Sequence, residues 1–88
     1  MEQTAAANVM TNYEAGYVVE VNHELVPYSI RVSSEEQAFE WLLFRTQRDQ
    51  SPHLVVWIDY RIQIPRKPIE RKTILTAVRS DGNWRLNT

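Results

Sequence analysis

The sequence predicts an α+β domain in which one α-helix packs on one face of an antiparallel β-sheet of about five strands. Three observations support this. A single segment with helical periodicity lies between segments in which apolar and polar residues alternate, the connections are short, and the chain has only 88 residues. A chain of this length forms one domain around one core. We expect residues 1–12 to form a flexible tail and residues 13–88 to form the domain, in the order β-β-α-β-β-β.

The first two strands are predicted as a hairpin. Apolar residues alternate with polar ones over 17–22 and again over 26–33, and a polar turn at 22–24 separates the two segments. Pro27 has no backbone N–H to donate to a neighbouring strand. The second strand therefore lies at an edge of the sheet, or Pro27 lies at its start.

Residues 33–49 are predicted to form the helix. Ser33 and Glu36 have the spacing of a capping box, and acidic residues at the start and arginines at the end suit the helix dipole. The apolar residues expected to face the sheet are Ala38, Phe39, Trp41, Leu42 and Leu43. Phe44 falls away from the centre of that face, so we expect it to be partly exposed.

Three strands are predicted after the helix. Residues 54–64 alternate without interruption, and 69–79 form an antiparallel partner beyond a proline-containing connection. Asp81-Gly82 is a strong hairpin signal, and it leads into a short last strand over 83–86.

The charge of the chain is distributed unevenly. Residues 1–60 hold three arginines against nine acidic residues, whereas 61–88 hold seven cationic residues against two, within a formal net charge of −1. A net charge near zero argues against general nucleic-acid binding, for which a clearly basic domain is typical. The chain has no cysteine and no apolar run long enough to span a bilayer. We therefore expect a soluble, cytoplasmic protein with no membrane partner.

The basic segment "IPRKPIERK", residues 64–72, stands out within this pattern. It holds four cationic side chains, those of Arg66, Lys67, Arg71 and Lys72, together with two prolines. Prolines restrict the free loop, which lowers the entropic cost of binding a partner. Lysine and proline at a hairpin tip also protect against aggregation, so the segment is either a contact site for an acidic partner or a solubilising turn.

A second candidate surface is the face of the long strand that points away from the helix. Alternation places Trp57 there, with Asp59 and Arg61 as neighbours. An aromatic side chain among mixed charges is typical of an interface hot spot. The same position could instead be covered by the N-terminal tail or by a second copy of the chain.

Catalytic and metal-binding motifs are lacking. The two histidines, His23 and His53, lie in predicted turns and have no metal-ligand spacing. No glycine-rich phosphate loop or nucleophile elbow occurs, and the chain lacks the glycine-flanked aromatic strand of an RNA-binding sheet. We expect no catalytic residue, metal or cofactor, and not an enzyme.

These observations favour a small non-enzymatic interaction protein that binds and modulates another macromolecule, most simply a protein, in the manner of an inhibitor or adaptor encoded by a phage or mobile element. Trp57, Tyr60 and Phe44 would be its apolar anchors, and the four cations of the basic segment would steer binding. Arg61 would also contact the partner.

Two further readings remain open. The basic 64–72 hairpin could bind nucleic acid. The acidic residues Glu35, Glu36, Glu40 and Asp49 could dock a second copy through its basic segment, or could imitate nucleic-acid phosphates toward a basic target.

Overall fold

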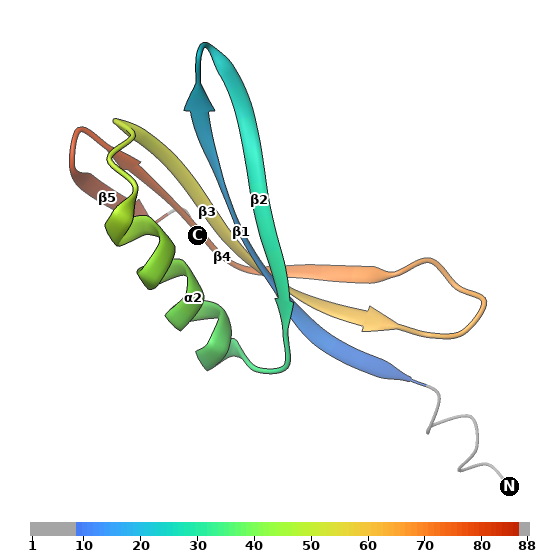
Figure 1. The fold of residues 1–88 in the computed structure, drawn as a ribbon. Coiled ribbons are helices and arrows are strands. Elements are labelled where there is room, and N and C mark those ends of the chain that lie inside the picture. The colour runs from blue at the N-terminus through green and yellow to red at the C-terminus, as the bar shows by residue number, and fades with distance from the viewer. Residues whose placement is uncertain (1–8, 87–88) are drawn as a thin grey trace, which may run out of the picture.

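The structure is a computed structural model that describes residues 9–86, and it contains five strands and one helix (Figure 1). The elements are β1 (Met10–Val21), β2 (Glu24–Val32), α2 (Glu35–Arg48), β3 (His53–Gln63), β4 (Glu70–Ser80) and β5 (Asn83–Leu86). The predicted α+β class and element order are confirmed. β1 starts at Met10, so it includes the last three residues of the expected tail, and residues 1–8 of that tail lie outside the described residues.

The strands form one antiparallel sheet in the order β2-β1-β3-β4-β5. β2 is an edge strand, which is the first of the two alternatives that Pro27 allows. The hairpin turn is the pair Asn22-His23, both with positive φ, so Val21 and Glu24 flank a two-residue turn. Hydrogen-bonded and non-hydrogen-bonded pairs alternate from such a turn, which puts Pro27 at a non-hydrogen-bonded position opposite Val18. Its missing N–H therefore faces the free edge.

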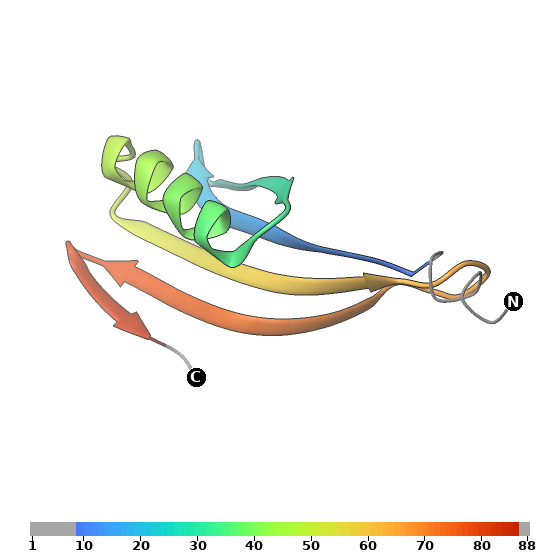
Figure 2. The same cartoon turned by 90° about the horizontal axis from the view of Figure 1, so that it is seen from below.

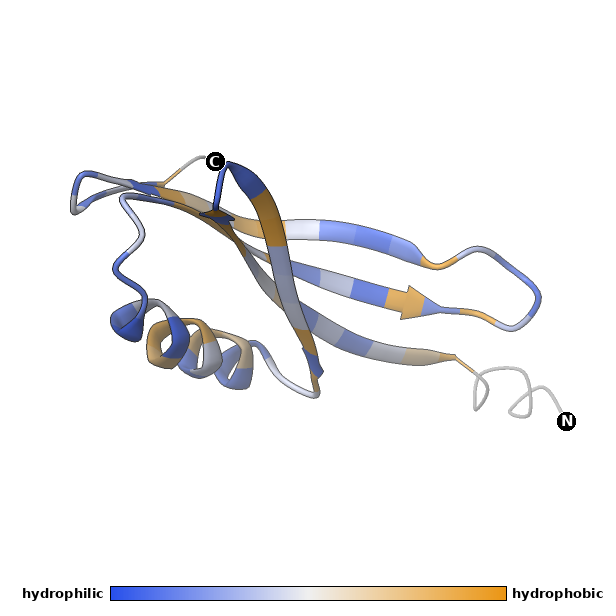
Figure 3. Ribbon diagram, turned by 45° about the horizontal axis from the view of Figure 1, so that its top comes forward, coloured by the Kyte–Doolittle hydropathy of each residue, from blue (hydrophilic) through white to orange (hydrophobic). Residues whose placement is uncertain are grey.

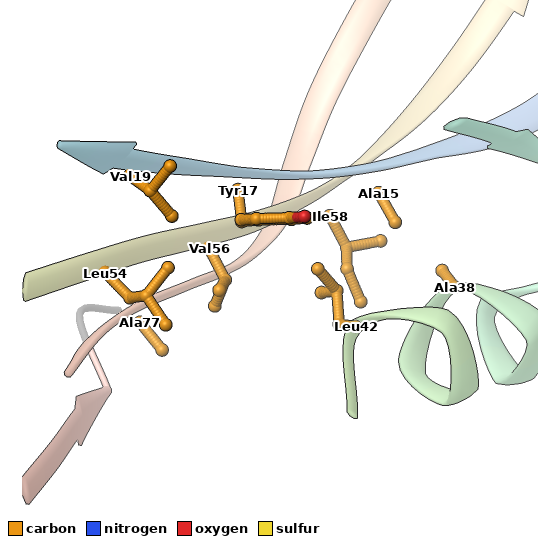
Figure 4. Packing of buried hydrophobic residues seen from close by; sticks show 9 residues of the cluster. All are labelled: Ala15, Tyr17, Val19, Ala38, Leu42, Leu54, Val56, Ile58 and Ala77. Atoms are coloured by element: carbon orange, nitrogen blue, oxygen red, sulfur yellow. The ribbon is translucent and has the colours of Figure 1, made fainter. Parts of the chain in front are cut away.

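The core lies between α2 and the strands beneath it (Figure 4). Its buried members are Ala15, Tyr17, Val19, Ala38, Leu42, Leu54, Val56, Ile58 and Ala77. The members on β3 are those that strict alternation assigns to the helix-facing side, so the predicted orientation of this strand is confirmed.

The helix begins one residue later than the predicted capping box implies. Ser34 is the N-cap, and its Oγ accepts a hydrogen bond of 3.1 Å from the backbone N–H of Gln37. The Gln37 Oε1 atom in turn accepts bonds from the N–H and hydroxyl of Ser33. The sequence SSEEQ contains two overlapping capping patterns, and the structure uses Ser34 with Gln37 in place of Ser33 with Glu36.

The helix covers only part of the sheet. α2 packs on β1, β2 and β3, and the β4–β5 side of the same face has no helix over it in the described part of the chain (Figures 1 and 2). The β3–β4 hairpin extends well beyond the helix, and its far half is largely hydrophilic (Figure 3). The fold therefore presents a projecting polar hairpin and an apolar face that α2 only half covers.

Candidate functional site

The tip of the β3–β4 hairpin is a tight turn that exposes Arg66 and Lys67. The N–H of Lys67 donates a 3.1 Å hydrogen bond to the carbonyl of Ile64, and Pro65 and Arg66 occupy the two central positions. Arg66 has a φ of 67°, in the left-handed region that favours glycine. A proline followed by a residue with positive φ is the arrangement of a type II turn.

Replacing Arg66 with glycine is expected to raise the free energy of unfolding by about 0.5–1 kcal/mol, because a left-handed backbone disfavours side chains with a Cβ. Urea unfolding followed by circular dichroism measures the change. Lys67→Gly is the matched control, since Lys67 is not among the residues with positive φ, and it should not stabilise. Equal effects of the two substitutions would contradict the turn geometry.

The other two cations of the basic segment lie on opposite faces of β4, as neighbours in a strand must. The guanidinium of Arg71 is ion-paired with Glu14 and also lies 3.7 Å from Asp59. Asp59 accepts a further bond of 2.7 Å from the hydroxyl of Thr73. Arg71 therefore belongs to a polar network on the sheet, and the four cations do not form one basic surface.

Arg61 is 2% exposed, so the structure removes it from the accessible surface. One of its nitrogens, Nη1, donates a 2.8 Å bond to the side chain of Asn12. Its Nε and Nη2 atoms have no hydrogen-bond partner within residues 9–86. In this conformation the side chain cannot steer a partner by direct contact.

Trp57 is half-buried on the face opposite the helix, where alternation predicts it. It lies beside Gly16 on β1, and a Cβ at Gly16 would stand 2.1 Å from the Cζ2 atom of the indole. The indole thus covers the bare backbone of Gly16. This contact covers part of the indole surface, so less of it is available to a partner.

The three expected anchors lie in three different places. Tyr60 is on the helix-facing side, where its ring centroid lies 5.2 Å from that of Tyr13. Phe44 is 51% exposed on the solvent side of α2, beneath the guanidinium of Arg48 at 4.4 Å. Since Trp57 faces the reverse side of the sheet, the structure does not bring these aromatic residues together.

An apolar groove lies instead between α2 and the β4–β5 side of the sheet. Its walls are large apolar side chains that remain exposed: Phe39 (40%) and Leu43 (57%) on α2, and Trp84 (48%) and Leu86 (70%) on β5. Its floor includes the core residues Val56 and Ala77, and its volume is about 240 Å³. Large apolar side chains that converge in this way mark an interaction site more often than isolated ones do.

The groove has little polar character. Thr46 also lines it, but the Thr46 hydroxyl donates a 2.7 Å hydrogen bond to the carbonyl of Leu42 within the helix. That donor is therefore already satisfied. A ligand of this groove must gain its affinity from apolar contact, or from groups at the rim.

Phe39 and Leu43 are predicted from the sequence to lie on the buried face of the helix, and this prediction is wrong. The buried helical residues are Ala38, Leu42 and Thr46. Phe39 and Leu43 follow on the flank that points over the uncovered part of the sheet. The sequence signal was an apolar stripe wider than a helix needs to cover three strands.

The two histidines lie near each other, because the β1–β2 turn and the start of β3 are adjacent. His23, His53 and Glu20 line one pocket. No group of three or more side chains with metal-ligand chemistry occurs within the described residues. The described part of the chain also contains no helix that is both long and apolar enough to cross a membrane.

The groove is therefore a surface on which exposed apolar side chains from α2 and β5 meet. Phe39 and Leu43 are one helical turn apart, and Trp84 and Leu86 are alternate residues of a strand, so each pair presents one continuous edge. Comparison of the chain with protein-family models, with curated proteins and with solved structures gave no match.

Proposed function

We propose that this chain is a non-enzymatic protein-binding domain, and that the groove between α2 and β5 is its docking surface. It would modulate a partner by occupying it, as an inhibitor or an adaptor does. The observation that carries this proposal is the convergence of Phe39, Leu43, Trp84 and Leu86 on one apolar groove.

The occupant is a segment of another protein that is apolar along its centre. The charges at the two rims define it further. Glu36 and Glu40 lie on α2, one turn before Phe39 and Leu43, and both are exposed. Beyond the other rim, Arg85 lies between Trp84 and Leu86 in sequence and is exposed on the opposite face of β5. A complementary segment carries basic groups toward the helix and an acidic group toward β5.

Apolar contact alone gives only part of the affinity. Burying the exposed half of each of the four side chains contributes about 1 kcal/mol, or about 4 kcal/mol together. A micromolar complex corresponds to about 8 kcal/mol. The partner must therefore also form polar contacts, and the groove borders a strand edge that offers them.

The alternative of nucleic-acid binding by the 64–72 hairpin has less support. Arg71 is ion-paired with Glu14, and Arg61 is buried. The remaining exposed cations are Arg66 and Lys67 at the tip and Lys72 on β4. Three dispersed cations are a weak electrostatic footprint for a phosphate backbone.

A photo-crosslinking amino acid at position 43, with position 44 as the matched control, tests the proposal. Leu43 and Phe44 are 57% and 51% exposed, but only Leu43 lines the groove. A protein from the encoding organism should crosslink at position 43 and not at 44. With that protein purified, Leu43→Glu should weaken binding at least about tenfold by calorimetry, because a desolvated charge in the groove costs more than 1.4 kcal/mol.

Phe44→Glu should leave the affinity within about twofold, since its side chain remains in water. Equal crosslinking at both positions, or equal loss of affinity in both variants, would overturn the groove as the docking surface. Loss of binding on Arg66→Ala with Lys67→Ala, with Leu43→Glu unaffected, would instead favour the hairpin. Circular dichroism of each variant first establishes that it is folded.

A further inference from the structure

Within residues 9–86, β5 combines apolar side chains with a backbone edge that pairs with no further strand. It follows β4 through the two-residue turn Asp81-Gly82, in which both residues have positive φ, and Ser80 pairs with Asn83. Hydrogen-bonded and non-hydrogen-bonded pairs alternate from such a turn. Trp84 and Leu86 therefore occupy non-hydrogen-bonded positions opposite β4, and their N–H and C=O groups point toward the outer edge.

The same two residues supply side chains to the groove. β5 thus presents a set of backbone donors and acceptors directly beside an apolar surface. Segments that bind by adding a strand use this combination: main-chain hydrogen bonds give affinity, and pockets for alternate side chains give specificity.

The opposite edge of the sheet is less suited to this. β2 carries Pro27, whose missing N–H faces outward. A strand added there would lose a hydrogen bond at the middle of the edge. The fold therefore protects one edge and leaves β5, with exposed Trp84 and Leu86, open to pairing.

We propose that the partner adds an extended segment to β5 as a sixth strand, which pairs with the backbone of Trp84 and Leu86 and places alternate apolar side chains in the groove. This inference rests on the proposed function of the groove. It identifies the partner as an extended peptide, not as a helix or a folded surface.

Arg85 defines the chemistry of that segment. Its side chain belongs to the face of β5 opposite to Trp84 and Leu86, and it is exposed. An added strand places one side chain beside Arg85, between two side chains that point into the groove. The expected pattern is therefore apolar-acidic-apolar, with aspartate or glutamate at the centre.

The same arginine argues against a second copy as the occupant. A two-fold pairing of β5 with itself that uses both Trp84 and Leu86 would place Arg85 directly opposite its symmetry mate. Like charges at directly opposite positions of neighbouring strands are destabilising. Charge complementarity favours an acidic segment of a different protein.

The test uses a random 12-residue peptide library displayed on phage and panned on the full-length chain. Panning should enrich apolar-acidic-apolar sequences over those recovered on the Leu43→Glu variant. On titration with the best synthetic peptide, the amide signals of Trp84, Arg85 and Leu86 should shift in ¹⁵N–¹H spectra. Hydrogen exchange of the Trp84 and Leu86 amides should slow, because these N–H groups become bonded.

Peptide N-methylation separates strand addition from simple filling of the groove. Methylating the amides that face β5 should weaken binding at least about tenfold, and methylating the alternate amides should have little effect, because only alternate amides pair with one neighbour. Arg85→Glu should reverse the preference, so that a peptide with lysine at its centre binds more tightly than one with aspartate.

Each remaining outcome counts against a specific part of the inference. Binding that Leu43→Glu abolishes, but that methylation at either position weakens equally, overturns strand addition and leaves the groove as a docking surface. Failure to enrich any sequence over the Leu43→Glu control overturns both strand addition and the groove as a docking surface. Concentration-dependent shifts at Trp84 and Leu86 without peptide, with a dimer in analytical ultracentrifugation, would show that a second copy is the occupant.

Discussion

Replacing Leu42 with alanine is expected to lower the free energy of unfolding by about 3 kcal/mol, the typical loss for a fully buried leucine. Leu42 is buried on the only helix of the described residues, and its side chain points toward Ile58 on β3 (Figure 4). The helix supplies two buried residues to the apolar core, Ala38 and Leu42, and the partly buried Trp41 packs against it. A cavity at this position therefore removes much of what holds α2 to the sheet.

A loss of this size matters because the domain is small. At about 0.1 kcal/mol per residue, a chain of 88 residues has a free energy of unfolding of about 9 kcal/mol. Urea unfolding followed by circular dichroism measures the change, with the m-value as a check on two-state behaviour.

Leu43→Ala is the matched control on the same helix, and we expect it to change stability by about 0.5 kcal/mol or less. Leu43 lines the open groove, so the substitution leaves no enclosed cavity. If the two substitutions destabilised equally, the groove would be covered in the free protein. Both the core and the docking surface would then have to be redefined.

The elements were predictable because their local patterns are strong. Apolar residues occupy every second position of β3 from Leu54 to Ile62, and β5 begins directly after the Asp81-Gly82 turn, as predicted. Pro27 limited β2 to an edge of the sheet or to a strand that starts at the proline, and β2 lies at an edge. Each of these signals acts within a few residues of the feature that it specifies.

The candidate site was harder to predict because it depends on how the elements are placed. Helical periodicity identifies the inward face of α2, but not how many of five strands the helix covers. Phe39 and Leu43 were therefore assigned to the core, although they line the groove. The wide stripe itself was visible in the sequence.

The ion pairs of the basic segment likewise depend on how the elements are placed. Strand pairing brings Arg71 next to Glu14 and Asp59, although Glu14 is 57 residues away in sequence. The β3–β4 register also shifts between Ile58 and Asp59, which no periodicity in the sequence predicts. Charges that are separate in sequence thus become partners only once the register is known.

Gly16→Ala is expected to destabilise the domain by about 2 kcal/mol, in the range of overpacked positions. A methyl group at position 16 would overlap the indole of Trp57, so the ring must leave its contact with β1. Strand interiors otherwise favour alanine over glycine by about 0.5–1 kcal/mol, because glycine loses more conformational entropy on folding. The clash must therefore outweigh an intrinsic preference of opposite sign.

A double-mutant cycle isolates this contact. In a Trp57→Ala background the steric clash with the indole is removed. Gly16→Ala should then be neutral or stabilising by up to about 0.5 kcal/mol. Gly82→Ala is the control: its φ of 84° makes alanine unfavourable by about 1 kcal/mol, but open space surrounds it, so the loss should be the same with or without Trp57. Urea unfolding of the variants yields the coupling energy between positions 16 and 57.

A coupling of about 2 kcal/mol would show that Trp57 is held on its own sheet as the cover of Gly16. The indole would then be part of the packing of the sheet, and a partner could contact only the edge of the ring that stays exposed. Additive effects would show that the ring is free to move off β1. Trp57 would in that case regain its place as an anchor on the reverse face, in competition with the groove between α2 and β5.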